Sequence, residues 1–327
     1  MVNQVDSTST GSAVSCRPQG PANTPAGLVR RFLELIRFSH TVFALPFAAL
    51  ACVFATVAPS TVELTTGLWC RRLFGVLLCM LTARSAAMAF NRLVDAKIDA
   101  ANPRTAQRHI PAGDLSALQV WLFCAAMSGL FVLACLLFLP NWLPIVCSLP
   151  VLVWICGYSF AKRFTSAAHL WLGVALALSP VCAWIALRGE MVIAHPSDLY
   201  PAVNLGLAIA FWVAGFDIIY ACQDADFDRQ QKLHSIPARF GVNGALRIAA
   251  WLHTAMLLVL CYLPSLSVLR LGSLYWIALA GVAVLVLTQH ALVSAKDLAR
   301  VNVAFFQVNA AISFGFCLLV AIDSWWG

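Results

Sequence analysis

Charge, and acidic charge above all, is scarce in this sequence. Only 11% of the 327 residues are charged and only 14 are Asp or Glu, whereas 61% are hydrophobic. An ordinary soluble domain is about 25% charged and about 45–50% apolar, so the composition excludes that class. Many of the apolar residues fall in long runs, and about 20 apolar residues suffice to cross a bilayer as a helix. The sequence therefore predicts a polytopic membrane protein.

Paired cysteines are also lacking. The chain has twelve Cys residues, but they lie singly, most of them within apolar runs, and no C-x-x-C pair occurs. Disulfides and a zinc site are therefore not expected, and the thiols are interpreted as small apolar side chains.

Nine apolar runs predict transmembrane helices near residues 39–58, 69–92, 117–139, 142–160, 167–187, 202–222, 246–264, 271–292 and 303–322. Only Pro140 and Asn141 separate the third run from the fourth, which indicates a tight helical hairpin. Residues 28–327 are expected to form one all-α membrane domain. Residues 1–27 are rich in Ser, Thr, Pro and Gly without an apolar core, and they are expected to be a disordered tail, not a signal peptide.

The basic residues predict the orientation of the chain. Most Arg and Lys residues fall in loops on the same side as the N-terminus, whereas the opposite side receives only Arg71, Arg72, Arg188 and Arg270, and Arg84 is left within a helix. By the positive-inside rule the N-terminus is cytoplasmic, in the cell (inner) membrane. The net charge of +7 is explained by this asymmetry and does not indicate a nucleic-acid partner.

Six of the 14 acidic residues fall in two short windows at the ends of apolar runs, both on the predicted cytoplasmic side. In the first window Asn91, Asp95 and Asp99 step by four residues. Four residues slightly exceed one helical turn, so successive side chains advance by only about 40° and share one face. The second window repeats this spacing in Tyr220, Asp224 and Asp228, with Asp217 two turns before Asp224 and Asp226 on another face.

Each window is followed by a polar, basic stretch that contains proline, so the chain has a weak internal repeat. Repeats of this kind commonly place a shared site at the interface between the two halves. We therefore expect the two acidic helix ends to face each other.

The side chains of the two windows are oxygen donors, which favours a hard cation such as Mg²⁺. Nearby basic residues suit the phosphates that Mg²⁺ often shares, namely Arg104, Arg108, Lys162, Arg163 and Lys232. One alternative is that the carboxylates only form ion pairs with these neighbours, which would contribute little. Another is a cation-coupled transporter, although acids at the bilayer midplane would suit that function better than acids at helix ends.

The two windows resemble the paired motifs of the UbiA superfamily of intramembrane prenyltransferases. Asn91, Asp95 and Asp99 match its N-x-x-x-D-x-x-x-D pattern, and Arg104-Thr105-x-x-Arg108-x-x-Pro111-x-Gly113 resembles the segment that follows. The second motif is similar in Asp217, Tyr220, Asp224 and Asp228, followed by Lys232, and the stretch from Tyr158 to Thr165 is similar to the family's basic loop after the fourth helix. The resemblance covers about residues 28–322, and Arg92 departs from it where many members have Asp.

The resemblance implies nine helices and a Mg²⁺-dependent transfer of a polyprenyl group from polyprenyl diphosphate to an aromatic acceptor, with the prenyl tail in membrane lipid. It assigns metal binding to Asn91, Asp95, Asp99, Asp224 and Asp228, diphosphate binding to Arg104, Arg108, Lys162 and Lys232, and the reacting end to Tyr220. Asp95, Asp99, Asp217, Asp224 and Asp228 are its catalytic candidates.

The opening from Arg37 to Phe47 is most similar to the 4-hydroxybenzoate polyprenyltransferase group, which implies a role in ubiquinone or menaquinone biosynthesis. A dihydroxynaphthoate is the alternative acceptor. Both acceptors carry a carboxylate, for which Arg37 is a candidate partner, with a positive-inside anchor as its other interpretation. His40 is a weaker candidate for the phenol, and Asp217 could activate the phenol or orient a basic residue.

Overall fold

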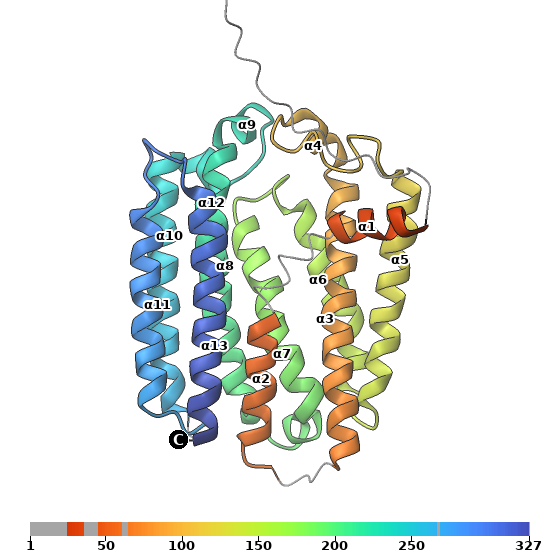
Figure 1. The fold of residues 1–327 in the computed structure, drawn as a ribbon, viewed down its shortest axis with the longest axis vertical. Coiled ribbons are helices and arrows are strands. Elements are labelled where there is room, and N and C mark those ends of the chain that lie inside the picture. The colour runs from red at the N-terminus through yellow and green to blue at the C-terminus, as the bar shows by residue number, and fades with distance from the viewer. Residues whose placement is uncertain (1–24, 36–44, 61–64, 267–268, 327) are drawn as a thin grey trace, which may run out of the picture.

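The computed structural model describes residues 25–35, 45–60, 65–266 and 269–326, which form an all-helical bundle (Figure 1). Its α-helices are α1 (Pro25–Leu35), α2 (Leu45–Val57), α3 (Thr66–Val94), α4 (Ala96–Ala101), α5 (Ala117–Ala134), α6 (Leu143–Ala161), α7 (Ala168–Ala194), α8 (Tyr200–Ala221), α9 (Ala225–Gln230), α10 (Ile236–Tyr262), α11 (Ser273–Ala291), α12 (Val301–Val303) and α13 (Asn309–Trp326). Short 3-10 turns lie at Cys135–Phe138, Pro196–Leu199, Cys222–Asp224 and Leu263–Ser265, and a π-turn at Ala304–Val308 precedes α13.

The predicted all-α membrane fold is confirmed. Eight helical segments of the described chain are long and apolar enough to cross a bilayer. The ninth expected span, 39–58, lies partly outside the described residues, and its described part is α2. The predicted hairpin is present too, because the turn after α5 ends at Phe138 and α6 begins at Leu143. The expected tail lies outside the described residues up to residue 24, and α1 begins at Pro25.

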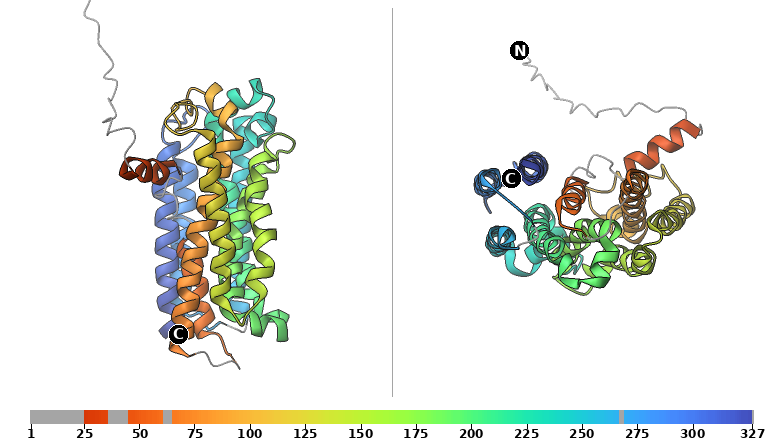
Figure 2. Two further views of the ribbon diagram at one scale, coloured as in Figure 1. Left: turned by 90° about the vertical axis from the view of Figure 1, so that its right-hand side faces the viewer. Right: turned by 90° about the horizontal axis from the view of Figure 1, so that it is seen from below.

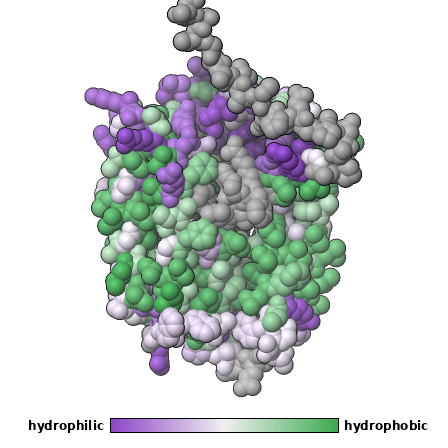
Figure 3. Space-filling view, in the orientation of Figure 1, coloured by the Kyte–Doolittle hydropathy of each residue, from purple (hydrophilic) through white to green (hydrophobic). Residues whose placement is uncertain are grey.

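The outer surface of the bundle divides into bands along its axis. In Figure 3 a wide hydrophobic band covers the middle, and hydrophilic residues gather at the end where α4 and α9 lie. Exposed aromatic residues mark the opposite helix ends, among them Trp142, Tyr200, Tyr262, Trp325 and Trp326. Amphipathic aromatic rings prefer the level of the lipid headgroups. The bands are those of an integral membrane protein.

Helix α8 is the most deeply buried span and carries the second acidic window. Seen along the bundle axis in Figure 2, α7 and α8 (green) lie between the C-terminal helices (blue) and α5 and α6 (yellow), whereas α2 packs beside α13. A Cβ atom added at Gly173 of α7 would lie 2.3 Å from the carbonyl oxygen of Ala210 on α8. Only glycine permits this close approach, which is the usual way in which small residues bring membrane helices together.

A buried ion pair fixes the bundle at the end far from the acidic windows. Arg188 Nη2 contacts Asp198 Oδ1 at 2.6 Å and donates to the carbonyl oxygen of Pro59 at 2.6 Å. Trp184 Nε1 donates to the same carboxylate at 2.9 Å. These contacts join the end of α2 to α7 and to the turn before α8.

The opposite end of the bundle gathers α4, α9 and α1 (Figure 1). Helix α1 lies across the bundle axis, and Arg31 on it donates to the backbone oxygen of Asp114 at 2.9 Å. The C-terminus lies at the far end of the bundle (Figure 1). Both acidic windows therefore lie at the same end, as the sequence predicted.

Candidate active site

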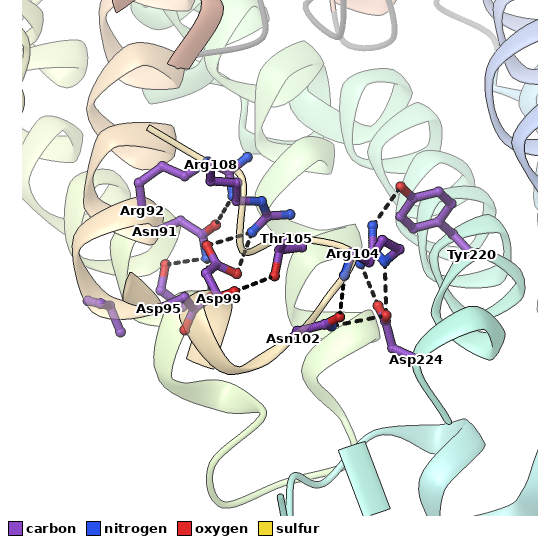
Figure 4. Close-up of polar contacts among 12 residues, drawn as sticks. Asn91, Arg92, Asp95, Asp99, Asn102, Arg104, Thr105, Arg108, Tyr220 and Asp224 are labelled. Atoms are coloured by element: carbon purple, nitrogen blue, oxygen red, sulfur yellow. Dashed lines mark hydrogen bonds and ion pairs between the residues drawn. The ribbon is translucent and has the colours of Figure 1, made fainter. Parts of the chain in front are cut away.

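The first acidic window lies at a break between two helices. Helix α3 ends at Val94, Asp95 has φ −90° and ψ 3°, and α4 begins at Ala96. The backbone N–H groups of Asp95 and Asp99 still donate to residues four positions earlier, at 2.9 and 2.7 Å. Asn91 Nδ2 donates to Asp95 Oδ2 at 2.9 Å (Figure 4). The spacing of the window is kept through the break, although the continuous helix that we expected is interrupted at Asp95.

The second window has the same construction. Helix α8 ends at Ala221, and Asp224, with φ −103° and ψ 7°, is followed by α9. Asp95 and Asp224 share this sparsely populated backbone conformation, and each precedes a helix of six residues. Asp99 and Asp228, four residues further on, are both buried, at 5% and 3% exposure. The internal repeat predicted from the sequence is therefore visible in the backbone.

A loop from the first half contacts the carboxylate of the second half (Figure 4). Helix α4 ends before Asn102, and the following proline prevents it from continuing. Arg104 Nε and Nη2 donate to Asp224 Oδ1 and Oδ2 at 2.9 and 2.5 Å, and Asn102 Nδ2 donates to Asp224 Oδ1 at 3.2 Å. Arg104 Nη1 also donates to the Tyr220 hydroxyl at 3.1 Å. The two halves meet at this contact.

Arg108, from the same loop, forms an ion pair with Asp99 of the first window. Its Nη1 atom lies 2.6 and 2.7 Å from the two carboxylate oxygens. Thr105 Oγ1 donates to the backbone oxygen of Asp99 at 3.0 Å. Two of the predicted phosphate ligands, Arg104 and Arg108, are thus paired with two of the predicted metal ligands.

The basic loop after α6 reaches both windows. Arg163 Nη2 donates to the backbone oxygen of Val94 at 2.7 Å. Burial disfavours the charged form of Lys162, but the fields of four carboxylates, Asp217, Asp228, Asp95 and Asp224, raise its pKa above the ordinary value. Burial likewise raises the pKa of the Asp95 carboxyl, against the opposing field of Lys162. Lys162 therefore interacts with carboxylates of both acidic windows.

Asp217 contacts a residue that the sequence analysis missed. His169, fully buried at the start of α7, places Nδ1 2.7 Å from Asp217 Oδ2. The backbone N–H of Ile236, the first residue of α10, donates to His169 Nε2 at 3.4 Å. Because Nε2 accepts a hydrogen bond, Nδ1 carries the proton and donates to Asp217. A lone histidine in an apolar run gives no sequence signal of this contact.

The remaining predicted residues lie elsewhere. Asp226 is 88% exposed and pairs with Arg229, which confirms that it does not share the face of the window. Lys232 is exposed and lines a surface pocket together with Arg229 and Arg239. Arg37 and His40 lie outside the described residues. Across the described ranges, no three Asp, Glu, His or Cys side chains gather closely enough to hold a metal ion between them.

An apolar cavity of about 180 Å³ is lined mainly by α3, α6 and α7. Its lining includes Met88 and Tyr158, which lie within a few residues of the first window and the basic loop, and Phe138 and Pro144 near the far ends of their helices. The cavity therefore extends from the acidic end of the bundle into the membrane region.

The family model that matches this chain is that of the UbiA prenyltransferase family, over residues 44–313. A 4-hydroxybenzoate octaprenyltransferase from Nitrosomonas eutropha is 32% identical over 242 residues, which are 72% of this chain and 79% of the relative. A protoheme IX farnesyltransferase from Vibrio campbellii is 31% identical over 230 residues, 69% of this chain and 72% of the relative.

Solved structures agree with this match. The structure of a UbiA homolog from Aeropyrum pernix K1 superimposes with a TM-score of 0.74 at 29% identity, covering 87% of this chain and 98% of the homolog. A UbiA homolog from Archaeoglobus fulgidus, solved with bound GPP and Mg²⁺, has a TM-score of 0.58 at 18% identity, covering 89% of this chain and 99% of the homolog. At 18% identity, the similarity to the A. fulgidus homolog is evidence for the fold alone.

Proposed function

This chain belongs to the UbiA prenyltransferase family, and we propose that it transfers a polyprenyl group from polyprenyl diphosphate to 4-hydroxybenzoate in quinone biosynthesis. The observation that carries the proposal is the meeting of the two acidic windows through Arg104, Asn102 and Asp224 at one end of an apolar bundle. Carboxylates, guanidinium groups and an adjoining apolar cavity are the three elements that a diphosphate with a long hydrocarbon tail requires.

In the proposed reaction, the C–O bond between the allylic carbon and the diphosphate breaks, and its electron pair leaves with the diphosphate. The ring carbon next to the phenolic hydroxyl forms the new C–C bond and then loses its proton to water. An allylic cation reacts readily with water, so the apolar side chains around the reacting carbon must exclude water until the ring attacks.

The donor set fits a divalent cation. The side chains concerned offer carboxylate and amide oxygens, which are the ligands that Mg²⁺ prefers, and the buried Asp228 Oδ2 has no hydrogen-bond partner among the described residues. Asn91, Asp95, Asp99, Asp224 and Asp228 are the residues proposed to hold it. When bound, Mg²⁺ neutralises the charge that builds on the leaving diphosphate. The Mg²⁺ in the A. fulgidus homolog supports the choice of a divalent cation.

The basic residues are proposed to bind the diphosphate oxygens. Arg104 and Arg108 contact Asp224 and Asp99, and a guanidinium that pairs with a carboxylate suits a phosphate equally well. Binding of the substrate would thus give each arginine diphosphate oxygens in place of its carboxylate, and Asp224 and Asp99 would be left free to hold the cation. Lys162 faces both windows and is proposed to balance the charge of the diphosphate, with Lys232 at the outer rim. Asp217, oriented by His169, is proposed to polarise the phenol.

The identity of the acceptor is the most specific part of the proposal. The relative from N. eutropha supports 4-hydroxybenzoate, whereas the relative from V. campbellii is named for haem, and a dihydroxynaphthoate is the alternative aromatic acid. Membership of a transferase family disfavours the cation-coupled transporter. We also propose that the acidic end of the bundle is cytoplasmic, on the basis of the distribution of basic residues.

The experiment is a transfer assay with the purified protein in lipid nanodiscs. It contains a polyprenyl diphosphate, Mg²⁺ and either 4-hydroxybenzoate, 1,4-dihydroxy-2-naphthoate or haem. We expect a lipid-soluble prenylated product with 4-hydroxybenzoate. Product with haem alone would overturn the acceptor assignment, and no product with any acceptor would overturn the transferase activity.

A further inference from the structure

A basic pocket opens on the surface of the bundle at the end that carries the acidic windows. One wall is the loop between α6 and α7, and the other is the chain from the end of α9 into α10. The pocket has a volume of about 760 Å³ and contains three cations, Arg229, Lys232 and Arg239. Its described lining includes no carboxylate. The proposed reaction accounts for Lys232 alone among these cations.

Hydrogen bonds between the two loops fix the walls of the basic pocket. The backbone N–H of His234 donates to the carbonyl oxygen of Lys162 at 2.7 Å. Arg239 Nη1 donates to Ser166 Oγ at 3.3 Å. The cations of one wall are therefore held against the polar groups of the other.

Lys232 occupies a backbone position that usually belongs to glycine. Helix α9 ends in a Schellman motif, because the N–H of Leu233 donates to the carbonyl oxygen of Asp228 at 2.8 Å and that of Lys232 to Arg229 at 3.2 Å. The residue between these bonds adopts a left-handed conformation, and Lys232 has φ 54°. Glycine adopts this conformation without steric cost. A lysine here keeps a long cationic side chain in the pocket at the expense of backbone strain.

Two of the three cations have no counter-ion within the described ranges. Arg229 pairs with Asp226 at 3.0 Å. Lys232 and Arg239 form no ion pair with a described residue, and Arg239 contacts only a hydroxyl and the ring of Phe240, 5.2 Å from its centroid. Positive charge in a pocket without carboxylates suits an anion, and both side chains donate well to phosphate oxygens.

Aromatic rings place the basic pocket at the membrane surface. Phe164 lines it and Phe240 follows Arg239, and the two are exposed at 60% and 51%. The ring of Phe164 packs edge-on against Trp171 at 6.3 Å, and Trp171 lies 5.0 Å from Trp154 on α6. Exposed aromatic rings prefer the level of the lipid headgroups. A free anion would not contact these rings, whereas a lipid has glycerol and acyl groups that would.

We infer that the basic pocket binds the phosphate group of an anionic phospholipid through Lys232 and Arg239. Basic pockets between membrane helices suit anionic headgroups for the same electrostatic reason. This site is additional to the transfer reaction. Lys232 is also proposed for the outer rim of the diphosphate site, so the decisive variants are those of Arg239, which has no part in the proposed reaction.

The test is native mass spectrometry of the full-length protein in detergent, titrated with phosphatidylglycerol or with phosphatidylcholine. Both lipids carry a phosphate, but only the first has a net negative charge. The variants are Arg239→Met, Arg239→Lys and Lys232→Met. Arg247→Met is the matched control, because Arg247 is exposed on the same helix and lies outside the pocket. Thermal unfolding of each variant shows whether it is folded.

We expect the wild type to bind one phosphatidylglycerol more tightly than phosphatidylcholine. Arg239→Met and Lys232→Met should each weaken binding of phosphatidylglycerol about fivefold, which is the contribution of one basic residue beside an anionic headgroup. Arg239→Lys should recover most of the loss, and Arg247→Met should bind normally. Equal binding of the two lipids, or the same loss in Arg247→Met as in Arg239→Met, would overturn the inference.

A competition arm distinguishes the lipid from free phosphate. Inorganic phosphate in large excess should leave phosphatidylglycerol bound, because the aromatic rings hold its apolar part. Displacement of the lipid by inorganic phosphate would show that the basic pocket is a site for the free ion and would overturn its assignment to a phospholipid.

Discussion

Arg104 and Asp224 form a two-point ion pair across 120 residues of sequence, with Nε to Oδ1 at 2.9 Å and Nη2 to Oδ2 at 2.5 Å. Arg104 comes from the loop after the first acidic window, and Asp224 belongs to the second. The guanidinium also lies over the ring of Tyr220, 5.3 Å from its centroid. This pair makes one site from two halves of the chain, and most of the predictions below concern it or its surroundings.

Two replacements of Arg104 should reduce activity to different extents. Arg104→Lys keeps the charge but loses the planar guanidinium, so we expect kcat/KM to fall about tenfold. Arg104→Ala loses both, and we expect kcat/KM to fall about 100-fold. The measurement is initial-rate kinetics with varied polyprenyl diphosphate. Arg229→Ala removes an exposed arginine of the same end and should have wild-type kinetics. Equal activity of Arg104→Ala and Arg229→Ala would contradict the role of Arg104.

The two windows should be equally sensitive to loss of charge. Asp95→Asn and Asp224→Asn each keep the shape of the side chain, and each should lower kcat at least 100-fold, because both carboxylates are proposed cation ligands. Asp226→Asn is the matched control, since Asp226 is exposed and pairs with Arg229 at the surface. If Asp226→Asn proved as damaging as Asp95→Asn, the repeat of four-residue steps would not define the site.

Removal of divalent cations should abolish activity reversibly. Dialysis against a chelator should stop product formation, and added Mg²⁺ should restore it. Asp228→Asn should need more Mg²⁺ for half-maximal activity, because it alters a carboxylate with a buried and unsatisfied oxygen. A Mg²⁺ titration of the wild type and the variant checks this, and an unchanged midpoint would argue that Asp228 serves the fold only.

His169 should stabilise the fold and orient Asp217. His169→Leu leaves the Asp217 carboxylate and the N–H of Ile236 without their partner, and each unsatisfied polar group costs about 1–3 kcal/mol. We expect a lower midpoint of thermal unfolding. His169→Asn, which still offers an N–H donor, should lose less. A midpoint like that of the wild type for both variants would show that the contact contributes nothing measurable.

Asp198 should matter for stability without affecting catalysis. Asp198→Ala leaves the buried guanidinium of Arg188 without its carboxylate, and removing one partner of a buried pair costs about 3–5 kcal/mol. The variant should unfold at lower temperature, and the fraction that remains folded should keep the wild-type KM for both substrates. A changed KM would show that the far end of the bundle influences the site.

Much of this fold was predictable from the sequence, because the bilayer constrains it so strongly. The positions of the spans follow from apolar length, and both acidic windows fall at one end because an even number of spans separates them. The hairpin at Pro140 and Asn141 follows from the short interval between two apolar runs. The site was predicted as two faces of equal spacing. The loop that carries Arg104 and Arg108 contacts Asp99, Tyr220 and Asp224, and Asn91 donates to Asp95 within the first window.

The pairing within the site was not predictable. Spacing along one helix shows which side chains share a face, but it does not show which arginine of the loop between α4 and α5 reaches which carboxylate. The break at Asp95 was missed because i to i+4 spacing is identical in a straight helix and in two helices joined at one bridging residue. His169 and Asn102 were missed as contacts because each acts on a residue distant in sequence.

The breaks at Asp95 and Asp224 have an electrostatic consequence. Each ends a long helix, α3 or α8, at the acidic end of the bundle. The aligned peptide dipoles of a helix place about half a negative charge at its C-terminal end. Two such ends add their potential to that of the carboxylates in a region of low dielectric, so this end of the bundle attracts cations more strongly than its side chains alone would.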